Sequence, residues 1–166
     1  MRLSSVLIFS AVLLAACSPE YNWRQYDSPD APYGVLFPDK PATYTRPVNL
    51  SGNSIDMTMT AAEVKHTVFA VGTGVAPDAA TAQAALTAMK TAMVRNIGAQ
   101  VTEEKTQPGS ALDVEARGVR NGQPMRLVGH FEARGNRFYQ VVVLGPDGSV
   151  PEEQVEQFMT SFKLRE

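Results

Sequence analysis

Polar and apolar residues alternate along several stretches of the chain, and this alternation predicts β-strands. The clearest stretch is 54–62, whose first face carries Ile55, Met57, Met59 and Ala61. We expect its second face to be exposed to water, since that face carries Asp56, Thr58 and Thr60. The mostly apolar segment 66–76 follows, and it predicts the hairpin partner of this strand.

Two turn signals predict an antiparallel meander in the second half of the chain. Asn121-Gly122 joins segment 112–120 to segment 123–133, and Gly135-Asn136 joins that segment to 137–144. Segment 137–144 is apolar on both faces, so we place it in the middle of a sheet, where both faces are covered.

The apolar period changes to that of a helix after Pro77. Asp78 is the expected N-cap, and Gly98 is the expected stop. Between them the apolar residues recur at helical spacing, at Ala82, Leu86, Met89, Met93 and Ile97. Many remaining positions are alanine, so we expect this helix to pack closely against the sheet.

A second helix is predicted close to the C-terminal end. Ser149 and Glu152 have the spacing of a capping box, which would open this helix. Its apolar stripe consists of Val155, Phe158, Met159 and Phe162. Acidic residues lie near its start and basic residues near its end, as the helix dipole favours.

These elements predict an α+β fold, with a mainly antiparallel β-sheet and two main helices packed on it. Shorter strands are expected at 34–37, at 42–46 between two prolines, and from Val101 onward. With 166 residues, the chain is long enough for one globular domain, which we place at 23–166.

Two short segments resemble those of the PsbP-like α/β/α sandwich, which includes an extrinsic photosystem II subunit and several bacterial lipoproteins. They are Tyr33-Gly34-Val35-Leu36-Phe37-Pro38 near the start and Phe158-Met159-Thr160-Ser161-Phe162 near the end. The order of elements agrees with that resemblance, which implies a fold and no functional residue.

Residues 1–16 have the three parts of an export signal. Arg2 lies near the start, an apolar stretch runs from Val6 to Ala16, and small residues precede the expected cut. The apolar stretch is shorter than the roughly 20 residues that a transmembrane helix needs. A cleaved signal is therefore favoured over a permanent membrane span.

The segment Leu14-Ala15-Ala16-Cys17 resembles the lipobox of bacterial lipoproteins. The resemblance implies cleavage before Cys17 and a lipid on its sulfur, and two or three acyl chains hold a protein stably at a membrane. Ser18 in place of aspartate favours the outer membrane over the inner one, by resemblance to enterobacterial sorting. The alternative is an ordinary secretory signal that leaves Cys17 as a free thiol.

Residues 17–22 form the expected lipidated N-terminus and a short tether, which keeps the domain close to the membrane surface. The aromatic residues Tyr21, Trp23 and Tyr26 follow immediately. They either cap the core of the domain, which is the usual role of large aromatic side chains, or lie among lipid headgroups.

Composition argues against nucleic-acid binding. Without Arg2, the mature chain has 14 basic residues against 17 acidic ones, a formal charge of -3. No basic run or basic stripe with interleaved aromatic residues supplies a phosphate-binding surface. Cys17 is the one cysteine, so the mature domain has no internal disulfide and no thiolate metal cluster.

Known catalytic and metal motifs are absent from the sequence, and we therefore predict no catalytic residue, no metal ligand and no cofactor. The two histidines, His66 and His130, are 64 residues apart and match no metal-ligand spacing. No nucleophile elbow or SxxK motif occurs. The Gly72-Thr73-Gly74 segment lacks the glycine and lysine of a phosphate loop, and we expect a bend or bulge there.

Two further clusters are better explained by structure than by chemistry. Glu103 and Glu104 are adjacent on a strand and should point to opposite faces. Methionines occur in pairs that could suggest soft copper ligands, yet each pair falls on a stripe facing the core: Met57 and Met59, then Met89 and Met93.

The leading hypothesis is a non-catalytic, membrane-anchored envelope module of the periplasmic side, which binds an envelope protein or another envelope component. One rival is an enzyme whose site forms only on folding, from His66 or His130 with Asp56 or Glu132. Another rival is a carrier of a small apolar ligand, which needs a cavity between helix and sheet.

The lipobox makes a direct prediction about mass. Protein purified from its native membranes should lack residues 1–16 and should carry added acyl mass, whereas the Cys17→Ala variant should not gain that mass. Intact-mass spectrometry of both proteins measures this. A mature wild-type chain without lipid would contradict the anchor.

Overall fold

The computed structural model describes residues 20–50 and 52–165. The expected signal peptide, Cys17 and Ser18 lie outside these residues. The strands are β1 (Arg24–Asp27), β2 (Tyr33–Phe37), β3 (Ala42–Leu50), β4 (Asn53–Val64), β5 (Thr67–Val75), β6 (Ala99–Thr106), β7 (Leu112–Arg120), β8 (Gln123–Arg134), β9 (Arg137–Pro146) and β10 (Lys163–Leu164). The helices are α1 (Ala79–Asn96), α2 (Glu152–Ser161) and the 3₁₀ turn η1 (Pro108–Ser110).

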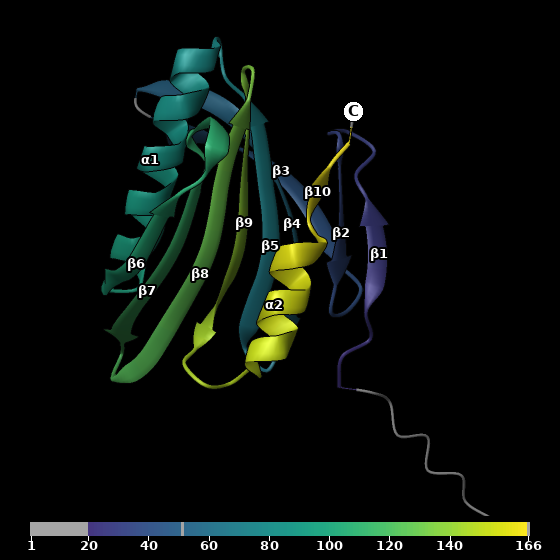
Figure 1. Ribbon diagram of the computed structural model, residues 1–166, viewed down its shortest axis with the longest axis vertical. Helices are drawn as coiled ribbons and strands as arrows, with labels where there is room; N and C mark the ends of the chain where they lie inside the picture. The colour runs from purple at the N-terminus through teal and green to yellow at the C-terminus, as the bar shows by residue number, and fades with distance from the viewer. Residues whose placement is uncertain (1–19, 51, 166) are drawn as a thin grey trace, which may run out of the picture.

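Seven strands form the main sheet in the order β3-β4-β5-β9-β8-β7-β6, and all neighbours are antiparallel. Three strands form a small sheet in the order β1-β2-β10. Figure 1 shows α1 on one side of the main sheet and α2 with the small sheet on the other. The predicted α+β fold with two helices on an antiparallel sheet is confirmed.

Strand β9 lies between β5 and β8, as its two apolar faces predict. Its residues from Phe138 to Val143 are all buried. The turn before it, at Gly135-Asn136, and the turn at Asn121-Gly122 both join antiparallel neighbours, as predicted. Asn121 and Gly122 both have positive φ, of 52° and 77°, which is the geometry of a tight hairpin turn.

Helix α1 covers one face of the main sheet with a smooth surface of small side chains. Ala82, Ala85 and Leu86 are fully buried against the sheet, together with Met89. Asp78 is the N-cap, and its carboxylate accepts a hydrogen bond from the backbone N–H of Thr81 at 2.7 Å. Across residues 20–50 and 52–165, no helix is long and apolar enough to span a membrane.

The second core lies between the main sheet, the small sheet and α2. Its centre is aromatic: Phe158 of α2 packs edge-on against Phe69 of β5 and also contacts Phe37 of β2. Tyr33 packs in the same layer and donates its hydroxyl to Thr60. Thr60 is therefore 1% exposed, and the prediction of a water-exposed second face on this strand was wrong there, because the small sheet covers it.

The N-terminal aromatic residues cap this second core, which is the first of the two roles considered for them. The Trp23 ring packs against Phe69, and its indole N–H donates to Gln154 of α2 at 3.1 Å. Tyr21 stacks on Trp23. Glu20 forms an ion pair with Lys65 at 2.7 Å, so residues expected in the tether already contact the domain.

The predicted capping box of α2 was wrong. The N-cap is Pro151, which has no side-chain cap. The Ser149 hydroxyl is 2.7 Å from that of Thr67, and Glu152 extends to Arg126 of β8. Tertiary partners have replaced the local hydrogen bonds that the spacing suggested.

Two expectations about backbone breaks were also wrong. Gly72 and Gly74 lie within a regular stretch of β5, without a bulge. A Cβ at Gly72 would fall 2.4 Å from the end of the Met57 side chain. Glycine therefore leaves the space that this core side chain occupies. Strand β3 continues through Pro47 instead of ending at it, since proline is tolerated in an edge strand.

The aromatic core predicts a large loss of stability on truncation of Phe69. Phe69→Ala should lower the free energy of unfolding by about 3–5 kcal/mol, because it removes the ring that both Trp23 and Phe158 contact. Val75→Ala, at a half-exposed position of the same strand, is the control and should change it by less than about 0.5 kcal/mol. Urea unfolding measures both. Equal effects would contradict this assignment of the core.

Candidate functional site

Only half of the main sheet is covered on the side of α2. Helix α2 and the small sheet lie over β4, β5 and β9, where the facing side chains are apolar. On β6, β7 and β8 the same face carries mainly charged side chains and a histidine: Glu103, Lys105, Asp113, Glu115, Arg117, Arg126, His130, Glu132 and Arg134. We call these three strands the open half of the sheet.

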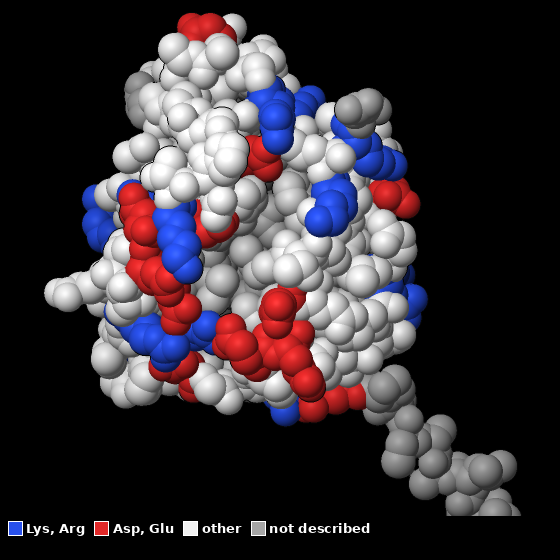
Figure 2. Space-filling view, viewed as in Figure 1, with Lys and Arg blue, Asp and Glu red and all other residues white. Residues whose placement is uncertain are grey.

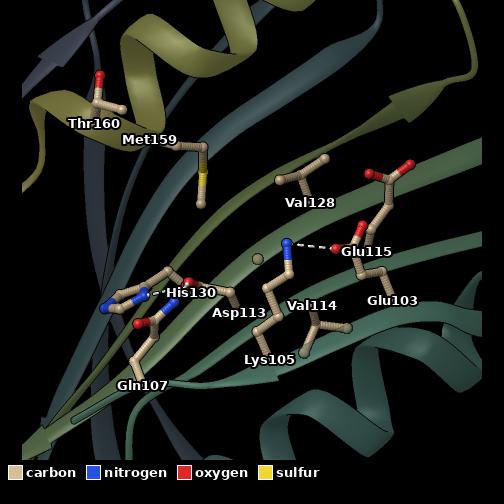
Figure 3. A pocket seen from close by; sticks show the side chains of 11 residues that line it. Glu103, Lys105, Gln107, Asp113, Val114, Glu115, Val128, His130, Met159 and Thr160 are labelled. Carbon is tan, nitrogen blue, oxygen red and sulfur yellow. Dashed lines mark hydrogen bonds and ion pairs between the residues drawn. The ribbon is translucent and has the colours of Figure 1, made fainter.

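A groove of about 470 Å³ runs between α2 and the open half. Its floor is formed by Val128 and by the backbone around Gly129, and Met159 and Thr160 of α2 form one wall. Figure 2 shows this hollow with an uncharged floor and charged side chains along its borders. In Figure 3, Met159 points from α2 toward the strands, and Lys105 stands up from the sheet opposite.

His130 lies at one end of the groove between two carboxylates. Its Nδ1 is 2.6 Å from Asp113 on β7, and its Nε2 is 3.1 Å from Glu132 on its own strand. Gln107 donates to the second oxygen of Asp113 at 2.7 Å, and Arg134 donates to Glu132. Both ring nitrogens of the histidine therefore contact carboxylates within the sheet.

Arg126 lies beside the groove, where it bonds to the lining residue Glu115, and it ties α2 to the sheet. Its guanidinium donates to both oxygens of Glu152 at the start of α2, and also to Glu115 of β7. These hydrogen bonds, above all those with Glu152, raise the pKa of Arg126 despite its partial burial. In turn, Arg126 lowers the pKa of Glu152.

A second ion pair lies beside this one. Arg117 of β7 bonds to Glu115 at 2.8 Å and to Asp147 in the loop before α2. The two arginines thus share Glu115, and the loop and first turn of α2 are held to the open half by charges of both signs. With Glu152, these side chains form a network of two cations and three anions, which has no surplus cation. Of the five, Glu115 lines the groove.

The structure brings together one pair from the enzyme hypothesis and separates the others. His130 and Glu132 are in contact, as given above. His66 lies in the β4–β5 turn, where its side chain is 91% exposed and 3.7 Å from Glu63. Asp56 is exposed on β4, opposite Pro47 of the edge strand β3.

The other candidate residues have structural roles. Glu103 and Glu104 do point to opposite faces, since Glu103 pairs with Lys105 at 2.6 Å and Glu104 pairs with Lys90 of α1 at 2.8 Å. The four methionines lie in the α1 core or against it. No group of three or more possible metal-binding side chains was found among residues 20–50 and 52–165.

No protein-family model matches the chain, and no curated protein is found to be similar to it.

Several residues in or beside the groove were not predicted from the sequence. Asp113, Lys105 and Arg126 belong to strands that were predicted, but their shared face was not. A usable signal was present, because charged residues recur at every second position of two strands, first at Asp113, Glu115 and Arg117, then at His130, Glu132 and Arg134. Met159 was predicted only as part of the apolar stripe of its helix.

The Arg126–Glu152 pair predicts a pH-dependent contribution to stability. Glu152→Gln should lower the free energy of unfolding near pH 7 by about 0.2–1 kcal/mol, a small value because the Glu152 side chain is 67% exposed and screened by water. The pKa of Glu152 is lower in the folded state, so the contribution is complete above the ordinary value of 4.5 and is lost as the pH falls further.

Glu153→Gln is the matched control, since Glu153 lies in the same first turn and bonds only to its neighbour Gln154. Urea unfolding at pH 7 should give a lower free energy of unfolding for Glu152→Gln than for Glu153→Gln. At pH 3 the two variants should have the same free energy of unfolding. A difference that persists at pH 3 would count against the ion pair as its cause.

Proposed function

We propose that this chain is a lipid-anchored envelope protein whose domain binds an envelope partner, without catalysis, in the groove between α2 and the open half of the sheet. The groove is the observation that carries the proposal. It combines an apolar floor with a polar border, which is the usual composition of a binding site.

The groove is lined from β6 across β7 and β8 to α2, and this span favours an extended segment of a partner protein as the ligand. Val128 and Met159 offer apolar contacts along its length, while Lys105 and Glu103 offer a donor and an acceptor at the border with β6. The Lys105 side chain is 67% exposed, so it can exchange its partner without leaving a buried charge behind.

Attachment to a membrane is supported by the lipobox and by the contacts of the first described residues. Glu20 is fixed by Lys65, and Trp23 by Gln154. Cys17 is three residues before Glu20, so a lipid on its sulfur would lie within about 10 Å of the domain along the chain. A partner in the same membrane, or close to its surface, is then within reach of the groove.

Contacts of the histidines favour binding over catalysis. A general base needs a free nitrogen within hydrogen-bonding distance of the proton that it removes. Both nitrogens of His130 contact carboxylates, and His66 is far more exposed than a catalytic group in a shielded site would be. The close packing of Ala82 and Ala85 likewise argues against a ligand cavity under α1.

Membership of the PsbP-like fold group remains part of the proposal. The order of layers supports it: one helix, an antiparallel sheet, then a layer that contains the second helix. The two short segments that suggested the resemblance, at 33–38 and 158–162, both contribute aromatic residues to the second core.

Site-specific photocrosslinking in intact cells tests the binding groove. A photoreactive residue at Thr160, which lines the groove, should give a discrete adduct with an envelope protein, and Val128→Lys should abolish that adduct by placing a charge on the apolar floor. The control position is Thr87, which is exposed on α1 at the opposite side of the sheet.

The outcomes separate the two parts of the proposal. Equal adducts from Thr160 and Thr87 would argue against the groove, even if mass spectrometry shows that Cys17 is lipidated. An adduct specific to Thr160 on a chain without lipid would support the groove and remove the membrane anchor.

A further inference from the structure

Strand β6 is an open edge of the main sheet. Within the described part of the chain, its only strand partner is β7, and its backbone groups bond to no segment other than β7. Seven of its eight residues are exposed, including Val101 at 42%. The opposite edge, β3, contains Pro47, which has no backbone N–H to donate to a further strand.

The charges on β6 make the edge selective. Exposed edge strands use charged side chains to prevent indiscriminate pairing, so a strand that pairs here has to bring complementary charges. On the face toward the groove, Glu103 lies opposite Glu115 of β7, and like charges in that position are unfavourable. Glu103 therefore lacks a cationic partner across the sheet, and its bond to Lys105 runs along its own strand.

We propose that β6 pairs with β6 of a second copy of this chain, antiparallel and centred on Glu104. In this register, Glu103 of each copy lies opposite Lys105 of the other, which supplies two cross-strand ion pairs on the groove face. The two Glu104 residues meet on the opposite face, where Lys90 of α1 already pairs with each of them at 2.8 Å.

The symmetry of this arrangement suits the fold. An antiparallel pair of identical strands has a two-fold axis perpendicular to the sheet, so both copies of α1 lie on one face and both copies of α2 on the other. The seven-stranded sheets become continuous. The two grooves, which each have Glu103 and Lys105 at their border, then lie side by side on one face.

The regular part of the new ladder is short. A bulge between Val101 and Glu103 limits regular pairing in this register to Glu103, Glu104 and Lys105, since Thr106 would lie opposite Thr102 at the bulge. An interface of this size is typical of reversible association, not of a permanent dimer. The inference does not depend on the proposed binding function, because it rests on the edge strand alone.

Disulfide crosslinking tests the register. The full chain with Cys17→Ala has no other thiol, so an introduced cysteine reports only on its own position. Glu104→Cys should form a disulfide dimer under mild oxidation, because residues directly opposite on antiparallel strands have Cα atoms about 4.5–5.5 Å apart. The control is Thr87→Cys, which is exposed on α1 and should stay monomeric.

Mixing two further variants tests the same register independently. Chains with Glu103→Cys should crosslink to chains with Lys105→Cys more readily than either crosslinks to itself. Crosslinking of Glu104→Cys no stronger than that of Thr87→Cys would overturn the proposal. So would preferential self-crosslinking of Glu103→Cys, which requires a different register.

Charge exchange tests the ion pairs by sedimentation of the Cys17→Ala chain. Glu103→Lys or Lys105→Glu alone should raise the dimer dissociation constant by about tenfold, because each change acts twice in a symmetric interface. The double variant E103K/K105E should restore it. A chain that stays monomeric at all concentrations, or single variants that have no effect, would overturn the proposal.

Discussion

Strand β9 needs cover on both faces, and the rest of the fold follows from this requirement. Its six central residues, from Phe138 to Val143, are buried, with apolar side chains on each side of the sheet. Helix α1 covers one side, and α2 with the small sheet covers the other. Burying apolar surface is the dominant favourable term in folding, so a domain built around this strand needs three layers.

The two covers differ in how they are built. Helix α1 continues directly from β5 and packs with alanines, so it lies close to the sheet along its length. The second cover is assembled from both ends of the described chain, with β1 and β2 from the start and α2 and β10 from the end. Aromatic rings fill the wider space there, with Phe158 between Phe37 and Phe69.

Because the second cover is too narrow for the whole sheet, it leaves β6, β7 and β8 open to water on one face. Charged side chains occupy that face, since a sheet needs a polar surface where no other layer covers it. The groove arises at the step between the covered half and the open half. Glu115 lines the groove and also bonds to Arg126, which holds the start of α2 through Glu152, so the proposed binding surface and the attachment of the helix share this residue.

The sequence alone determined most strands, both helices, two hairpin turns and the central place of β9, because alternation, helical period and turn residues are local properties of the chain. It also contained Leu14-Ala15-Ala16-Cys17, which resembles a lipobox. Only the tertiary structure decided which strands stay uncovered, where Glu152 finds Arg126, and that His130 meets Asp113 from a neighbouring strand. The partners in these contacts are 17 or more residues apart, and such pairing depends on strand register and on the position of α2, which no short segment specifies.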